Sequence, residues 1–141
     1  MKPSYDVALL HQALPAMVRA NPKLLASGTY YVARHQSGPV IGCGGWSVER
    51  PGTFHIDPGV GHIRHFAVSP SWIGQGIGRR IYQACEKQAR SNGVITFDVF
   101  ASLNALCFYK LVGFNKIEEI NVAMGPGINL PSVWMRRSIC P

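Results

Sequence analysis

Ser69-Pro70-Ser71-Trp72-Ile73-Gly74-Gln75-Gly76-Ile77-Gly78-Arg79-Arg80 is the stretch that decides the fold of this 141-residue chain. It follows an extended segment, His62 to Val68, and the residues after it predict a helix that continues to about Ser91. The alternating glycines therefore fall where a strand ends and a helix begins. Such a turn leaves several backbone N–H groups free, and the helix dipole adds partial positive charge. The turn therefore suits a phosphate or pyrophosphate.

The spacing of these glycines differs from that of two other phosphate-binding turns. A Walker loop ends in Gly-Lys-Ser/Thr, whereas Gly78 is followed by Arg79-Arg80. A Rossmann fingerprint reads G-x-G-x-x-G and has an acidic residue about 20 residues further on. Here the spacing is G-x-G-x-G, and Asp98, at about that distance, does not cleanly end the next βα unit. Taken alone, the glycines also fit a tight helix start that binds nothing.

Two stretches resemble the sequence motifs of the GNAT-type N-acetyltransferases. The first is His65-Phe66-Ala67-Val68-Ser69-Pro70 followed by Gly74-Gln75-Gly76-Ile77-Gly78, which resembles the acyl-CoA-binding motif. The second is Ser102-Leu103-Asn104-Ala105-Leu106-Cys107-Phe108-Tyr109-Lys110-Leu111-Val112-Gly113-Phe114, which looks like the family helix that ends in F-Y-x-x-x-G-F. Together the motifs cover roughly residues 60 to 115. The chain departs from the family at Ile73, where Arg or Gln is usual, so a side-chain contact to phosphate is lost.

This resemblance implies an α/β (α+β) fold with a mixed, mostly antiparallel central sheet flanked by helices, and acetyl-CoA as the acyl donor. Main-chain groups of the strand at 66–68 would bind the pantetheine arm and polarise the thioester carbonyl, as oxyanion-type donors do. A plain sheet strand is the alternative for residues 66–68. The implied cofactor-binding residues are Phe66, Ala67, Val68, Ile73, Gly74, Gln75, Gly76, Ile77, Gly78, Arg79, Asn104 and Tyr109.

Acyl transfer to an amine also needs two proton transfers. The amine must lose a proton, because an alkylammonium with a pKa near 10.4 is not nucleophilic, and the leaving thiolate must gain one. The resemblance makes Tyr109 the general acid, with a core aromatic as the alternative. His62 lies near the position where some family members carry a glutamate base, so it is the candidate base. His55 and Glu49 are further candidates, and a water chain is another route. In a regular strand His65 would face away from His62.

Composition and charge narrow the remaining classes of function. The net charge of +7 favours an anionic partner. The basic residues are scattered and match no nucleic-acid motif, which favours a cofactor with several phosphates over nucleic acid. The sequence has no long apolar run or apolar leader, and Cys43, Cys85, Cys107 and Cys140 form no C-x-x-C pair. We therefore expect a cytoplasmic, single-domain protein (residues 1–141) without a membrane span or metal, its thiols reduced and mostly buried.

The other elements follow from periodicity and from turn residues. Residues 4–26 are expected to be helical, with a break at Pro15. Glycines in the second strand, Gly42 to Gly45, predict either close packing against a helix or a place in a substrate cleft. Ser102 is the expected N-cap of the second motif's helix. The remaining expected elements are strands at 28–34, 39–48, 61–68, 94–100, 114–124 and 132–139, and helices at 73–91 and 102–112.

Several alternatives stay open at this point. In the resembled family a strand and a helix usually precede the first strand, and this chain begins too late to hold both. An acetyl-CoA sensor or an inactive family member is therefore the alternative to an enzyme, followed by a basic nucleic-acid binder. The acceptor is a primary amine of a small molecule, a lysine or a peptide N-terminus. Dimers are common in the family, so a homodimer is also an expectation.

Overall fold

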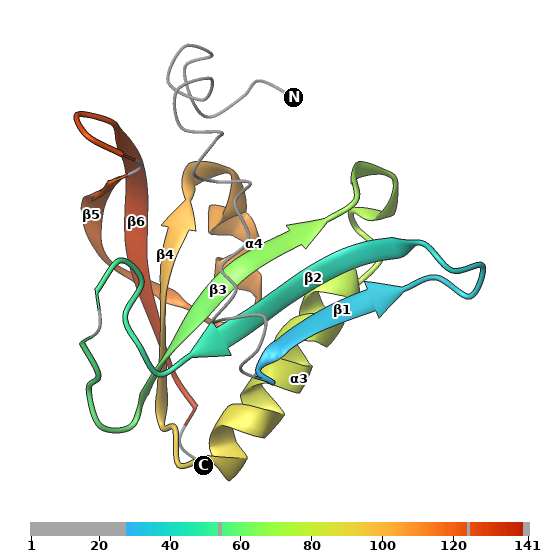
Figure 1. Cartoon of the computed structure of the whole chain (residues 1–141), viewed down its shortest axis with the longest axis horizontal. Helices are drawn as coiled ribbons and strands as arrows, with labels where there is room; N and C mark the ends of the chain where they lie inside the picture. The colour runs from blue at the N-terminus through green and yellow to red at the C-terminus, as the bar shows by residue number, and fades with distance from the viewer. Residues whose placement is uncertain (1–27, 54, 124, 140–141) are drawn as a thin grey trace. The chain divides into compact units, whose positions relative to one another are not determined.

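The computed structural model describes residues 28–53, 55–123 and 125–139, which are drawn in colour in Figure 1. The segment predicted to be helical, residues 4–26, lies outside this part of the chain. The described residues form six strands in one sheet, in the order β1-β2-β3-β4-β6-β5. In chain order the elements are β1 (Tyr30–Arg34), β2 (Val40–Ser47), β3 (Val60–Val68), η1 (Pro70–Trp72), α3 (Ile77–Ser91), β4 (Thr96–Ser102), η2 (Leu103–Ala105), α4 (Leu106–Leu111), β5 (Asn115–Ala123) and β6 (Asn129–Ser138).

The fold prediction is confirmed: the chain combines helices with a mixed, mostly antiparallel sheet. The pairs β1–β2, β2–β3 and β5–β6 are all antiparallel. The described chain divides into two compact units, residues 28–97 with 138–139 and residues 98–137. We call them the α3 unit and the α4 unit and describe each by itself.

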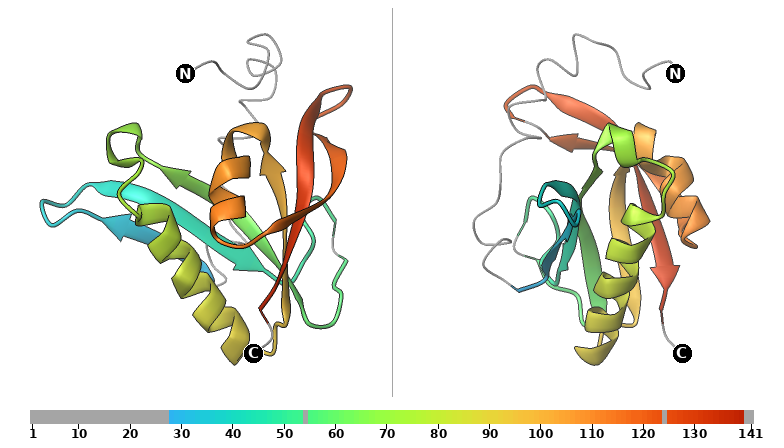
Figure 2. Two further views of the ribbon diagram at one scale, coloured as in Figure 1. Left: turned by 180° about the vertical axis from the view of Figure 1, so that it is seen from behind. Right: turned by 90° about the vertical axis from the view of Figure 1, so that its right-hand side faces the viewer.

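In the α3 unit, helix α3 lies along one face of β1, β2 and β3, as Figure 2 shows. The glycines of β2 permit this close approach. A Cβ added at Gly42 would lie 2.8 Å from Ile77 Cγ2 and 3.3 Å from Ile81 Cδ1. Of the two interpretations of the glycine-rich strand, close packing against a helix is therefore confirmed at Gly42.

The buried side of α3 is apolar, so burial of this face is what holds the helix on the sheet. Tyr82 and Trp46 both contact the ring of Phe97, with centroid separations of 6.1 and 6.2 Å. Glu86 and Arg90 of the same helix form an i,i+4 ion pair at 3.6 Å. The buried residues of the helix are Gly78, Ile81, Tyr82, Cys85 and Ala89.

Helix α3 begins four residues later than predicted, at Ile77 instead of Ile73. Gly74 and Gly76 have φ angles of +85° and +80°, in the left-handed region, and a right-handed helix cannot continue through such residues. The predicted stop is confirmed: Asn92 is the C-cap, and Gly93 follows with φ +83°.

In the α4 unit, β5 and β6 form an antiparallel hairpin, and β6 begins at Asn129, earlier than the predicted 132. The helix predicted at 102–112 is shorter than expected. Strand β4 continues to Ser102, a 3-10 turn follows, and α4 occupies only Leu106–Leu111. Ser102 is the N-cap of the 3-10 turn that precedes α4, but its side chain makes no capping hydrogen bond, and the N-cap of α4 itself is Ala105.

The thiols of Cys43, Cys85 and Cys107 are free, as predicted. Burial was predicted correctly only for Cys85; Cys43 is half-buried and Cys107 is exposed. Burial raises the pKa of the Cys85 thiol to about 12.

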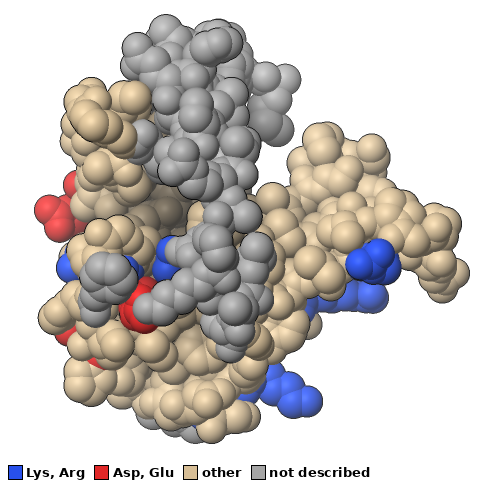
Figure 3. Space-filling model, viewed as in Figure 1, with Lys and Arg blue, Asp and Glu red and all other residues tan. Residues whose placement is uncertain are grey.

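No helix among the described residues is long and apolar enough to cross a membrane. On the face shown in Figure 3, most of the described surface carries no charge.

Candidate functional site

The turn between η1 and α3 has the backbone geometry of an anion site. Gly74 and Gly76 both hold left-handed φ angles, which glycine adopts without strain. A Cβ added at either glycine would meet no atom of the described residues within 4 Å. Of the predicted contact residues, Ile73 is 68% exposed, and Gln75 and Arg79 are exposed.

The backbone N–H groups of this turn have no acceptor in the described part of the chain. Among the residues that the structure describes, none accepts a hydrogen bond from the N–H groups of Gly74 through Arg79. The first N–H of α3 with a partner is that of Arg80, which donates to the Gly76 carbonyl at 3.0 Å. The first turn of the helix also carries no acidic side chain. A run of main-chain donors therefore meets the positive end of the helix dipole, which is a favourable place for a phosphate.

Strand β3, which leads into this turn, contains a bulge. His65 has φ +52°, and the register with β2 shifts between Cys43 and Gly45. The expectation of a regular strand around His65 was therefore wrong, and simple alternation does not predict which way its side chain faces. The His65 carbonyl accepts a hydrogen bond from the Tyr30 hydroxyl at 3.1 Å, which fixes the bulge against β1. Burial and the neighbouring Cys43 raise the pKa of the Tyr30 phenol.

The predicted cofactor strand, Phe66 to Val68, directly follows the bulge. Ala67 and Val68 pair with Cys43 and Gly42 of β2. The ring of Phe66 covers Gly44, because a Cβ there would lie 2.5 Å from Phe66 Cδ1. All the predicted cofactor residues from Phe66 to Arg79 lie in the α3 unit, on the end of β3 and the turn that follows it.

The candidate bases lie in different settings. His62 is only 3% exposed and pairs with Ser47 across β2 and β3. Glu49 is half-buried and forms an isolated bridge with Ile56. His55 is exposed and contacts Asp57 at 2.8 Å, so it belongs to a surface pair. His62 is thus the most enclosed of the predicted bases.

In the α4 unit, Tyr109 is the buried residue of α4, with 5% of its surface exposed. Its ring packs edge-on against Phe108 and Phe114, with centroid separations of 5.1 and 5.5 Å. The ring is therefore a core aromatic, whatever its hydroxyl does. Asn104, in the 3-10 turn before α4, is exposed.

One contact near the turn was not anticipated from the sequence. The His35 ring, at the β1–β2 hairpin tip, lies 4.9 Å from the ring of Trp72, which ends η1 just before the glycines. His35 is held by its own turn, where its Nδ1 lies 2.6 Å from Ser37 Oγ. The hairpin thereby supports the start of the glycine turn. Two aromatic side chains far apart in the sequence give no periodic signal, so this pair could not have been predicted.

If the turn binds the acetyl-CoA that the motif resemblance implies, replacing His35 with Ala should raise the dissociation constant for acetyl-CoA about 3- to 10-fold, since an aromatic pair contributes roughly 0.5–1.5 kcal/mol. Turnover at saturating acetyl-CoA should stay unchanged, because only the support of the turn is lost. His35→Phe keeps a ring and should restore affinity. Titrations of each variant with acetyl-CoA measure this effect; equal affinities for all three proteins would show that the hairpin does not support the turn.

This geometry defines a class of protein: an α/β protein whose helix N-terminus offers main-chain N–H donors to an anion. Residues 3–114 match the model of the acetyltransferase (GNAT) family. The chain belongs to the GNAT acetyltransferase family, as its two motifs predicted. No protein of curated function matches the sequence significantly.

Solved structures of this family share the fold. A Mycobacterium tuberculosis protein in complex with CoA is 22% identical, with a TM-score of 0.66, over 93% of this chain and 92% of that chain. Ribosomal-protein-alanine N-acetyltransferase from Brucella melitensis is 19% identical, with a TM-score of 0.63, over 96% and 80%. A phosphinothricin acetyltransferase from Sinorhizobium meliloti, in complex with AcCoA, is 20% identical, with a TM-score of 0.65, over 84% and 65%. At these identities the likeness establishes the fold alone.

Proposed function

We propose that this GNAT family member is an N-acetyltransferase that uses acetyl-CoA and a primary amine. The observation that carries the proposal is the run of main-chain N–H groups from Gly74 to Arg79 without a described acceptor. Structural neighbours in complex with CoA or AcCoA support the choice of acyl donor. The names of the neighbours point to different acceptors, a ribosomal protein alanine and phosphinothricin, so they select none for this chain.

Different residues of the chain would bind different parts of the acyl donor, acetyl-CoA. The N–H groups of Gly74 to Arg79 would bond the diphosphate oxygens, and the exposed guanidinium of Arg79 would add positive charge. Main-chain groups of Phe66 to Val68 would hold the pantetheine arm, and Asn104 would bond its amides. Bound acetyl-CoA would supply an activated thioester, whose C–S bond breaks as the N–C bond to the amine forms.

Two side chains would move the protons of this exchange. His62 would accept the proton that the amine loses, which a neutral imidazole does well near neutral pH. Tyr109 would donate its phenolic proton to the sulfur of the leaving thiolate. Because the ring of Tyr109 is packed between Phe108 and Phe114, its hydroxyl would be held in one direction.

Release of free CoA thiol in the presence of a panel of primary amines tests this function. The panel should include amino acids, a peptide N-terminus, lysine side chains and simple alkylamines. At least one amine should raise thiol release far above hydrolysis without acceptor, with mass spectrometry showing the acetylated amine. Binding of acetyl-CoA without transfer to any amine would favour a sensor, and absence of binding would overturn the proposal altogether.

His62→Asn should lower kcat about 100-fold at neutral pH, within the range for loss of a general base. In this variant the rate should keep rising with pH toward the pKa of the amine itself, near 10.4, because no side chain then removes the proton. The wild type should reach its plateau at lower pH. His55→Asn, a change in the exposed pair with Asp57, is the control and should leave the pH profile unchanged. Identical profiles for wild type and His62→Asn would exclude His62 as the base.

A further inference from the structure

Arg64 is a half-buried cation with few partners among the described residues. Its Nη1 donates to Ser47 Oγ at 3.0 Å. Within residues 28–53, 55–123 and 125–139, no other hydrogen bond and no ion pair of this guanidinium is present. Burial lowers the pKa of Arg64, and the charge of Glu49 opposes that shift only in part. A guanidinium has five N–H donors, so most of those on Arg64 have no acceptor among the described residues.

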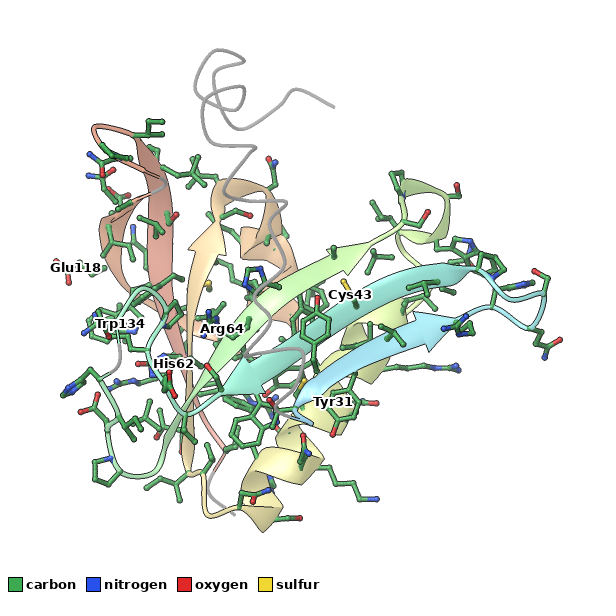
Figure 4. The ribbon with its side chains drawn as sticks, in the orientation of Figure 1. Tyr31, Cys43, His62, Arg64, Glu118 and Trp134 are labelled. Atoms are coloured by element: carbon green, nitrogen blue, oxygen red, sulfur yellow. The ribbon has the colours of Figure 1, made fainter. Side chains whose placement is uncertain are left out.

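The position of Arg64 places it on the same side of the sheet as the proposed base. Arg64 of β3 pairs with Gly45 of β2, and His62 of β3 pairs with Ser47 of β2, so the two pairs are two residues apart on each strand. Residues two apart on a strand share a face. The contact to Ser47 therefore tilts the guanidinium toward the His62 position. Both residues lie on β3 before the bulge and are labelled in Figure 4.

Ser47 holds the guanidinium in this place. Its hydroxyl oxygen accepts a hydrogen bond from Arg64, and the hydroxyl donates a hydrogen bond to the backbone carbonyl of Glu49 at 2.8 Å. The hydroxyl is thus fixed both as a donor and as an acceptor. Burial lowers the pKa of the neighbouring His65, and the charge of Arg64 lowers it further. The positive charge of Arg64 therefore affects the protonation of a neighbouring side chain, and no described ion pair neutralises it.

We propose that Arg64 binds a carboxylate of the acceptor, so that the preferred acceptor is an amine that also carries a carboxylate, as an amino acid does. This inference rests on the proposed acetyl transfer and names the substrate class for it. A planar guanidinium fork matches the two oxygens of a carboxylate, and such charge-assisted pairs are strong. An acceptor without an anionic group would leave the donors of Arg64 unmatched as water is excluded, and it would be selected against.

Matched acceptors test this inference directly. Each amino acid is compared with its own amide, which keeps the amine and removes the carboxylate, and an aminoalkylphosphonate tests whether another anion suffices. The wild type should favour the carboxylate over the amide about 10- to 100-fold in kcat/KM, the effect expected for charge-assisted hydrogen bonds. Arg64→Gln should abolish the preference, and Arg64→Lys should keep part of it. Arg90→Gln, on the outer side of α3, is the matched control and should keep all of it.

A second measurement does not depend on turnover. Calorimetry with an N-acetylated amino acid and its amide should show tighter binding of the carboxylate by the wild type and equal binding by Arg64→Gln. Thermal unfolding checks that each variant is folded. Equal binding of both compounds by the wild type overturns the inference, and so does an unchanged preference in folded Arg64→Gln. If acetyl transfer to amines without a carboxylate were still observed, the proposed function would stand. Selective carboxylate binding without release of the CoA thiol in the presence of any acceptor would show a carboxylate site at Arg64, but it would refute the transferase and with it the assignment of that carboxylate to an acceptor. A stronger preference for the phosphonate than for the carboxylate would contradict the choice of carboxylate.

Discussion

Gly76→Ala should weaken acetyl-CoA binding about 10- to 100-fold, the size expected when charge-assisted hydrogen bonds are lost. Gly76 has φ +80°, and a Cβ added there, beside the run of N–H donors, would lie within 4 Å of no described atom. A methyl group there would stand between those donors and a diphosphate. Calorimetric titration with acetyl-CoA measures the change in the dissociation constant.

Gly52→Ala is the control that separates binding from backbone strain. Gly52 has φ +78°, and a Cβ added there would likewise lie within 4 Å of no described atom, but Gly52 lies in the loop after β2. Both substitutions should lower the free energy of unfolding by about 1–2 kcal/mol, because both force alanine into the left-handed region. Only Gly76→Ala should lose affinity. If the two variants bound acetyl-CoA equally well, the turn would not be the diphosphate site.

Tyr109→Phe should lower kcat about 100-fold or more, as is typical when a general acid is removed. The ring and its packing against Phe108 and Phe114 would remain, so the variant should fold and bind acetyl-CoA as the wild type does. Steady-state kinetics at saturating amine and acetyl-CoA measure the loss.

Tyr82→Phe offers the same chemical change at another buried tyrosine. The Tyr82 hydroxyl donates to Glu86 on α3 at 3.0 Å, so its loss should affect stability and leave kcat unchanged. Leaving groups of lower pKa should partly rescue Tyr109→Phe, because they need less help from an acid. An unchanged kcat in Tyr109→Phe would remove this phenol from the mechanism.

Local features of the sequence predicted the parts of the site that depend on the backbone. Alternating glycines before an amphipathic helix indicated a phosphate turn, because few other residues allow φ angles near those of Gly74 and Gly76. One boundary was misread: Gly74 and Gly76 lie before the helix, so α3 starts at Ile77 and only Gly78 lies in its first turn. Periodicity could not fix that boundary, since Ile73 and Ile77 fit one helical face equally well.

Features that depend on contacts between strands were not predictable from one sequence. The bulge at His65 needs a left-handed residue that sequence patterns do not mark, and it ends the regular alternation of β3. The contact between His35 and Trp72 and the hydrogen bond from Arg64 to Ser47 join residues that are distant along the chain. The predicted roles of His62 and Tyr109 came from the resemblance alone and remain proposals.

The measurement that tests the central claim most directly is the response of the backbone amides to two ligands. In ¹⁵N-resolved NMR spectra, CoA should shift the N–H signals of Gly74, Gly76 and Gly78 downfield, because phosphate oxygens become their acceptors. Pantetheine, which has the thiol arm without the diphosphate, should leave these signals in place. Unmoved glycine signals at saturating CoA, or equal shifts with pantetheine, would contradict the account.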